Sequence, residues 1–261
     1  MTLAYYRVGA GKEFWSEHWR GHSLAELLAV ARRSPLTSLI VKALPRTGVV
    51  LEAGCGLGQY VALLREVGWR AIGVDRVADA LAASRRAAGI PLAAMDLRRL
   101  AIGDGALAAY VSLGVVEHDA EGPDAILAEA ARALAVGGVA LVSVPYLNGV
   151  RRLGLPYLRW QNARIARRGA DFHQYAFTRR ELVEALARHG LVTRRTHAYD
   201  PARLLRDAWR RLTRGSGNGP GGAGDAAPSS RGLRGHVRRA LYTPPALALL
   251  GHMILAVAVK R

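Results

Sequence analysis

The sequence has little that could cross-link the chain or anchor it. Its one cysteine, Cys55, excludes a disulfide framework and fits a reducing compartment. The longest apolar stretch covers 246–259, contains His252 and is too short to cross a bilayer, so we interpret it as a buried strand. Charged residues between positions 7 and 17 leave no apolar core for a secretory signal. These absences predict a cytoplasmic protein.

Acidic residues are scarce in one region only. Residues 1–150 hold 15 lysines and arginines against 14 acids, whereas residues 151–239 hold 20 arginines against six acids. A GC-rich genome would favour arginine over lysine, of which the chain has three, but it would not remove acids from a single region. The formal net charge of +17 is therefore concentrated in that region, which predicts an anionic partner for it.

What the sequence does contain is a regular alternation of apolar runs and helical patterns. Five runs predict strands, at 48–53, 70–75, 90–96, 106–114 and 139–145. Helical patterns lie between most of them, at 58–68, 77–88 and 122–138. A further helix and two more strands follow, at 178–190, 191–199 and 252–260. This order predicts an α/β fold with a doubly wound, Rossmann-like parallel sheet.

Capping signals predict several short helices around this sheet. One face of an N-terminal helix carries four rings, those of Trp15, His18, Trp19 and His22. Ser23 and Glu26 form a capping box for a second helix, and Ser34-Pro35 opens a third. Thr178 and Glu181 repeat the capping box later in the chain, with Phe177 and Leu182 spaced as a hydrophobic staple.

A glycine-rich turn follows the first predicted strand of the sheet. Gly54, Gly56 and Gly58 are spaced G-x-G-x-G, whereas a dinucleotide fold usually shows G-x-G-x-x-G. Gln59 stands where that third glycine would fall. Asp75 ends the next strand, where a carboxylate can accept hydrogen bonds from a ribose diol. The pattern predicts a site for a nucleoside-like cofactor.

Three further segments follow in an order that resembles one family: Met95-Asp96, "YVSLGVVEHD" at 110–119 and "RALAVGGVALVSVP" at 132–145. Together with the glycine turn they resemble class I S-adenosylmethionine-dependent methyltransferases, in particular the type 11-like, small-molecule group related to ubiquinone-biosynthesis enzymes. The resemblance covers about 45–200 and the last strand. It implies a seven-stranded sheet whose final strand is antiparallel, and a methyl transfer from S-adenosylmethionine.

The same resemblance implies a role for each cofactor-binding residue. Glu52 and the backbone of Gly54, Gly56 and Gly58 would face the methionine half of the cofactor. Asp75 would hold the ribose. The adenine would meet Asp96 and the backbone of Leu97, and the sulfonium would lie beside Leu113. Two alternatives stay open, namely a scaffold that binds the cofactor without catalysis and a nicotinamide-dependent oxidoreductase, which the glycine spacing disfavours.

Methyl transfer requires a general base only when the acceptor is a poorly acidic hydroxyl or a protonated amine. His118 follows the fourth strand, where this fold places the acceptor, but it could equally be a helix-entry residue bonded to the backbone. His173 and Tyr175 lie in a segment that walls the acceptor pocket in related enzymes, or they simply pack a connecting loop. In similar enzymes the N-terminal helix covers the cofactor. No residue spacing indicates a metal site.

The basic region has three stretches that mix arginines with apolar residues, at 151–169, 203–214 and 231–239. They could adsorb to an anionic membrane and so meet a lipid-linked acceptor at the inner membrane surface. They could instead bind RNA, which would make the protein an RNA methyltransferase, although no RNA-binding module is recognisable. The third interpretation is a solvated face packed through its apolar side.

These observations predict four segments. Residues 1–45 form an N-terminal helical cap, and residues 46–200 form the core that binds S-adenosylmethionine. Residues 201–251 form a basic insertion with a flexible loop at 215–230, and residues 252–261 supply the last strand of the core. The acceptor is expected to be a small molecule or a lipid-linked one, with nucleic acid as the less favoured partner.

Overall fold

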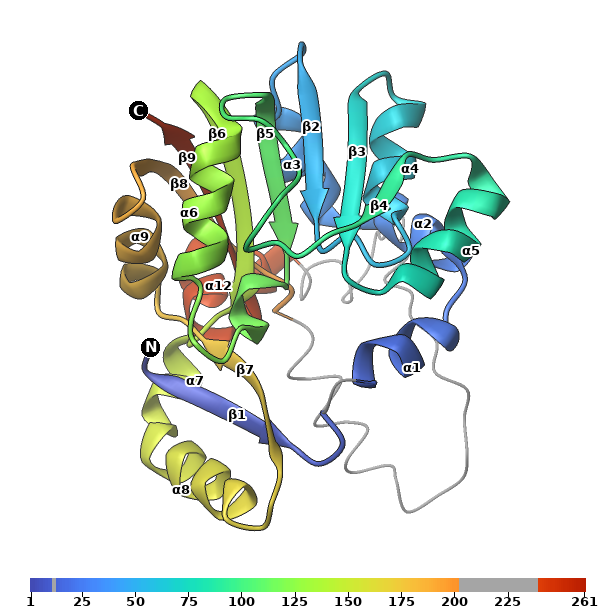
Figure 1. Cartoon of the computed structure of the whole chain (residues 1–261). Coiled ribbons are helices and arrows are strands. Elements are labelled where there is room, and N and C mark those ends of the chain that lie inside the picture. Colours follow the sequence, from blue (N-terminus) through green and yellow to red (C-terminus); the bar gives the residue numbers. More distant parts are fainter. Residues whose placement is uncertain (11–12, 202–238) are drawn as a thin grey trace.

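A seven-stranded sheet organises the chain, and its order confirms the predicted fold (Figure 1). The computed structural model describes residues 1–10, 13–201 and 239–261. Five strands run parallel, in the order β4 (Leu92–Ala94), β3 (Arg70–Asp75), β2 (Val49–Ala53), β5 (Leu107–Leu113) and β6 (Leu134–Pro145). The sheet continues with β9 (Met253–Lys260) and ends at β8 (Leu191–Tyr199). β9 is antiparallel to both of its neighbours.

Two hydrophobic cores fill the space on either face of this sheet. Val50 and Leu51 are both fully buried, but they belong to opposite cores because neighbouring residues of a strand point to opposite faces. One core includes α6 (Asp124–Ala133) and α9 (Arg179–Ala187). The other includes α2 (Leu24–Arg33), α3 (Pro35–Ala43), α4 (Gln59–Glu66) and α5 (Ala78–Ala88).

A second, smaller sheet lies beside the carboxyl ends of the main strands (Figure 1). Its strands β1 (Leu3–Arg7) and β7 (Asp171–Ala176) are antiparallel, and α7 (Gly149–Leu153) and α8 (Leu155–Ala166) join it to β6. Leu3, Leu147 and Ala176 form its buried centre. The N-terminal segment, which we expected to be purely helical, therefore begins with a strand before α1 (Phe14–Arg20).

Local capping signals were read correctly, whereas three boundaries were not. Both predicted capping boxes are present, on α2 and on α9, and Ser34 caps α3. The helix expected to reach Gly137-Gly138 ends at Ala133, and both glycines lie within β6. The run 246–259 is not one strand, because α12 (Pro244–Leu250) precedes β9. α1 also ends before His22.

Several expectations fall on residues outside the described ranges. These are the basic-apolar stretch at 203–214, the loop at 215–230 and most of the stretch at 231–239. The division of the chain into cap, core, insertion and final strand stays a prediction. Within the described residues, no helix is both long enough and apolar enough to cross a membrane.

Candidate functional site

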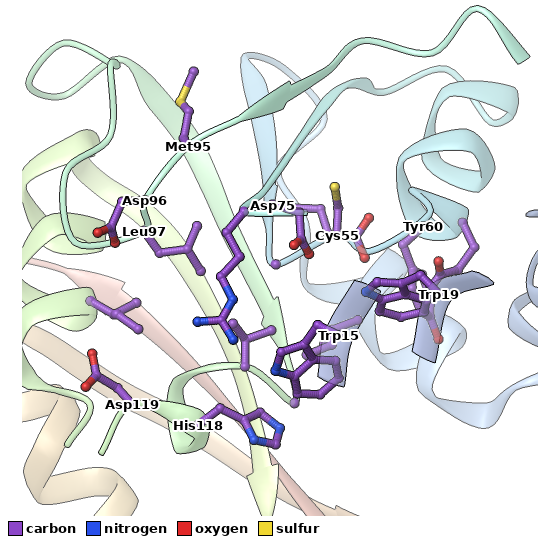
Figure 2. Close-up of a pocket in the computed structure, with 18 of the residues that line it drawn as sticks. Trp15, Trp19, Cys55, Tyr60, Asp75, Met95, Asp96, Leu97, His118 and Asp119 are labelled. Atoms are coloured by element: carbon purple, nitrogen blue, oxygen red, sulfur yellow. The ribbon is translucent and has the colours of Figure 1, made fainter. Parts of the chain in front are cut away.

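A cavity of about 880 Å³ opens at the carboxyl ends of β2, β3 and β5 (Figure 2). The helix after β2 packs on one face of the sheet and the helix after β5 packs on the other. Open α/β sheets bind their ligands at the point where neighbouring strands send their following helices to opposite faces of the sheet. The volume of the cavity is typical of a site for a small molecule. The wall of the cavity includes Glu52, Gly54, Asp75, Asp96, Leu97 and Leu113.

The glycine turn adopts a backbone that only glycine tolerates well. Gly54, Gly56 and Gly58 have φ angles of 77°, 55° and 79°. A Cβ atom on Gly54 would lie 2.4 Å from a methyl of Val115, and one on Gly56 would lie 2.4 Å from the ring of Trp19. The turn therefore leaves no room for side chains and presents its backbone to the cavity.

Asp75 ties this turn to the end of β3. Its carboxylate accepts a hydrogen bond from the backbone N–H of Gly56 at 2.8 Å and another from Val77 at 3.1 Å. The side chain is largely buried but still lines the cavity. One carboxylate thus fixes the shape of the turn and keeps a negative charge at the cavity wall.

Glu52 is a second acid in the wall, with a side chain that is only 3% exposed. It accepts a hydrogen bond from the backbone N–H of Val61 at 3.0 Å. Burial raises the pKa of Glu52 to about 8, the Val61 bond opposes that shift, and the charge of Asp75 adds to it. A cation in the cavity would favour the ionised form, so Glu52 suits a positively charged ligand.

The raised pKa of Glu52 predicts that the cofactor-free protein becomes less stable as pH rises from 6.5 to 8. An unfolded glutamate ionises near pH 4.5, so between these pKa values the folded state holds the extra proton. Each pH unit in this window should lower the free energy of unfolding by up to about 1.4 kcal/mol for this one group. Urea unfolding at several pH values measures the slope.

In that experiment Glu52→Gln should reduce the slope, because glutamine does not ionise. The matched control is Glu184→Gln, which removes an exposed glutamate that pairs with Arg180. Equal slopes in the wild-type protein and in Glu52→Gln would contradict the buried, protonated state of Glu52.

The opposite end of the cavity is formed by the segment after β4. Asp96 and Leu97 line it together with Met95 (Figure 2). The Asp96 carboxylate is half-exposed and pairs with Arg98, whose Nη2 lies 2.9 Å from Oδ2. The hydrogen bonds from Arg98 lower the pKa of Asp96. This end therefore offers an ionised carboxylate next to an apolar wall.

Helix α1, near the N-terminus of the chain, forms another wall of the cavity. Trp15 and Trp19 both line it, and Trp15 lies beside His118 with 4.8 Å between ring centroids (Figure 2). Trp19 contacts the glycine turn over Gly56. Of the four rings predicted on one face of this helix, the two tryptophans line the cavity and His18 and His22 do not. That this helix covers the cofactor stays a prediction.

His118 ends the short 3₁₀ turn Val116–His118 that follows β5, and it also lines the cavity. Its Nδ1 lies 2.7 Å from the backbone carbonyl of His173. Because a carbonyl can only accept, Nδ1 carries the proton and Nε2 of the neutral ring has a free lone pair. Burial lowers the pKa of His118 to about 4, which keeps the ring neutral near pH 7.

Glu117 is the neighbour of that lone pair. Its Oε1 lies 3.9 Å from Nε2 of His118, and its Oε2 is buried without a hydrogen-bond partner among the described residues. Burial raises the pKa of Glu117 to about 8. Since the raised pKa of Glu117 and the lowered pKa of His118 both favour neutral forms, this contact is not an ion pair.

The other two candidate catalytic residues do not line the cavity. His173 packs its ring against His118 at 5.2 Å between centroids and holds that residue through its backbone carbonyl. Tyr175 donates its hydroxyl hydrogen to the carbonyl of Ala120 at 2.8 Å. Both residues therefore contact the loop that carries His118.

Several residues that line the cavity were not predicted from the sequence. Arg76 directly follows Asp75, so its position next to the predicted ribose site was a usable signal. Tyr199 and Met253 come from the ends of β8 and β9, which pair with each other. Only the strand order brings these two residues to the cavity, and no local pattern reveals that order.

Comparison with known proteins identifies the class. Residues 51–142 match the family model described as a methyltransferase domain. The chain is also 30% identical over 163 residues to the protein-L-isoaspartate O-methyltransferase of Chlorobaculum tepidum, a match that covers 59% of this chain and 67% of that protein. The chain belongs to the class I S-adenosylmethionine-dependent methyltransferases. Its cofactor is S-adenosylmethionine, as the motifs predicted.

Solved structures share the fold. A methyltransferase from Archaeoglobus fulgidus that depends on the same cofactor superposes with a TM-score of 0.58 and 17% identity, covering 96% of this chain and 100% of that one. The geranyl diphosphate C-methyltransferase of Streptomyces coelicolor gives 0.56 and 16%, covering 100% of this chain and 90% of that one. At such identities the likeness concerns the fold alone.

The cavity suits this cofactor chemically. Five acids line it, namely Glu52, Asp75, Asp96, Asp119 and Asp200, against the two arginines Arg76 and Arg98, and this excess of acids favours a ligand with a sulfonium and an ammonium group. The buried Oε1 of Gln59, another lining residue, has no hydrogen-bond partner among the described residues and can accept from an ammonium. Within the described ranges, no group of three or more histidines, cysteines and acids could hold a metal ion.

Proposed function

We propose that the chain transfers a methyl group to a hydroxyl or amine of a small organic acceptor, and that His118 removes the acceptor's proton. The free lone pair of its neutral ring, at the cavity wall beside the end of β5, carries this proposal. A neutral imidazole in that place can take a proton from a bound nucleophile.

The roles that the resemblance implies for the cofactor-binding residues form part of this proposal. The glycine turn, Glu52 and Gln59 would hold the methionine end, Asp75 would hold the ribose, and Asp96 and Leu97 would hold the adenine. This arrangement leaves Leu113, the last residue of β5, and His118, in the turn that follows, for the reacting groups. S-adenosylmethionine supplies a methyl group from a sulfonium centre, which leaves as a neutral thioether.

His118 then takes up the proton that the acceptor loses. As the acceptor's oxygen or nitrogen forms its new bond to carbon, its proton moves to Nε2 of His118, and the ring becomes an imidazolium. The His173 carbonyl keeps the ring in place through the Nδ1 hydrogen. The carboxyl of Glu117 lies 3.9 Å from Nε2 and is therefore an acid beside the new imidazolium. Trp15 excludes water from the same corner of the cavity.

The walls around His118 favour an acceptor with a sizeable apolar part. Trp15, Leu113, Tyr199 and Met253 line this side of the cavity. Such surfaces bind apolar groups through burial. The structural neighbour from Streptomyces coelicolor acts, by its name, on geranyl diphosphate, which supports a small-molecule acceptor. We further propose that this acceptor is linked to a lipid.

The test is transfer of labelled methyl groups from the cofactor to fractions of a cell extract. Lipid extract and polar metabolites form two arms, and total RNA forms a third. We expect label in a low-molecular-mass acceptor of the lipid or metabolite arm, and less label with the His118→Asn variant. Label confined to RNA, or cofactor binding without label in any arm, would contradict the proposal.

A further inference from the structure

Helices α7 and α8 carry an outward stripe of large apolar side chains. Val150, Leu153, Tyr157 and Trp160 follow one another at intervals of three, four and three residues, which keeps them on one side of a helical path. All four side chains are exposed, Leu153 at 83% and Trp160 at 57%. Leu249 of α12 extends the stripe, because it is exposed and lies against Gly149 at the start of α7.

The opposite side of α8 is the one that packs. Asn162 is buried and bonds to the backbone of Tyr6 in β1, while Leu155 and Leu158 pack on the small buried centre beneath the helix. The outward stripe is therefore not needed to hold the small sheet together. Apolar side chains of this size, gathered on one face, indicate an interaction surface.

The charge beside this stripe has one sign. Residues 149–170 contain six arginines and no acid. Arg152, Arg164, Arg167 and Arg168 are exposed, and none of the four takes part in an ion pair with a described residue. The Arg164 guanidinium lies 5.7 Å from the Trp160 ring centroid, so charge and apolar surface are directly adjacent.

We infer that this arginine–aromatic face, made of the apolar stripe and these four arginines, binds an anionic lipid bilayer. Tryptophan and tyrosine favour the depth of the headgroups, aliphatic side chains enter below them, and arginines remain at the phosphates. Leu153 and Val150 offer no flat ring on which a nucleic-acid base could stack, so the face suits lipid better than RNA.

The face lies close to the reaction site along the chain. β7 starts five residues after α8 ends and carries His173, whose carbonyl holds His118. Both helices lie on the side of the molecule to which the carboxyl ends of the main strands point, α7 near those ends and α8 beyond the small sheet (Figure 1). Bilayer binding through this face would bring the cavity near an acceptor dissolved in the membrane. This consequence rests on the proposed function. The binding itself does not.

A fluorophore at position 153 tests the inference directly. Cys55 is 1% exposed and burial raises the pKa of its thiol, so an environment-sensitive thiol reagent will label an introduced cysteine instead. Leu153→Cys is the test variant. Val136→Cys is the control, since Val136 is 79% exposed and lies near the start of β6, at the far edge of the sheet.

Vesicles of phosphatidylcholine with phosphatidylglycerol should shift the emission of the position-153 label to the blue and leave the position-136 label unchanged. Affinity should fall at least about tenfold on vesicles of phosphatidylcholine alone, because each arginine near an anionic surface contributes roughly a fivefold factor. Neutralising Arg152, Arg164, Arg167 and Arg168 to glutamine should cause a similar loss, whereas Arg70→Gln, at the far edge, should not.

A blue shift with RNA but not with vesicles would overturn the inference in favour of a nucleic-acid surface. Vesicle binding that leaves the position-153 label unchanged would assign the binding to another part of the chain. Neither outcome bears on methyl transfer, which the labelled-acceptor experiment tests in solution without vesicles.

Discussion

Turnover is expected to fall by about 10²-fold or more when His118 is replaced by asparagine, while cofactor affinity stays nearly unchanged. Asparagine can still donate to the His173 carbonyl that Nδ1 contacts at 2.7 Å, so the loop should keep its place. What it lacks is a basic nitrogen for the acceptor's proton. Single-turnover rates measure the loss, and calorimetry with the demethylated cofactor measures the affinity.

His189→Asn is the matched control. His189 bonds to Asp124 at 2.8 Å, away from the cavity, and its replacement should leave turnover nearly unchanged. A His118→Asn enzyme that turns over at the wild-type rate would show that positioning alone suffices. A parallel loss of cofactor affinity would mean that His118 only shapes the cavity.

Cofactor binding is expected to collapse in Gly56→Val, to about a hundredth of the wild-type affinity or less. Valine at a φ of 55° is strained, and its Cβ would lie 2.4 Å from Trp19. Displacing either the turn or the tryptophan changes the surface that faces the cofactor. Titration calorimetry on the folded variant measures the effect.

Gly89→Val separates strain from collision. Gly89 has a similar φ of 62°, but no atom lies within 4 Å of its Cβ position. This variant should lose stability and keep its affinity for the cofactor. Asp75→Ala, which leaves the N–H groups of Gly56 and Val77 without their acceptor, should weaken binding like Gly56→Val. Wild-type affinity in both site variants would overturn the assignment of the cavity.

The strands and helix starts of this protein could be predicted because their causes are local. A capping box such as Ser23 with Glu26 lies within four consecutive residues, and a buried strand is recognised by a short apolar run. Strand β1 could not be predicted in this way, since its partner β7 begins 168 residues after β1 does. The stretch 246–259 was misread because an apolar run alone does not separate helix from strand.

The site divides in the same manner. The glycine turn and Asp75 follow consecutive segments and form a recognisable spacing. Tyr199 and Met253 reach the cavity only because β8 ends and β9 begins there, side by side. The pKa values of Glu52 and His118 depend on burial by residues from several elements, which no sequence window contains.

The place of β9 between β6 and β8 also sets an order of events during synthesis. Its two neighbours leave the ribosome first, yet they cannot pair with each other across the gap that β9 fills. Until residues 253–260 emerge, both strands present open edges, and such edges attract other chains. A chain that stops before Met253 would keep its glycine turn but should aggregate rather than bind its cofactor.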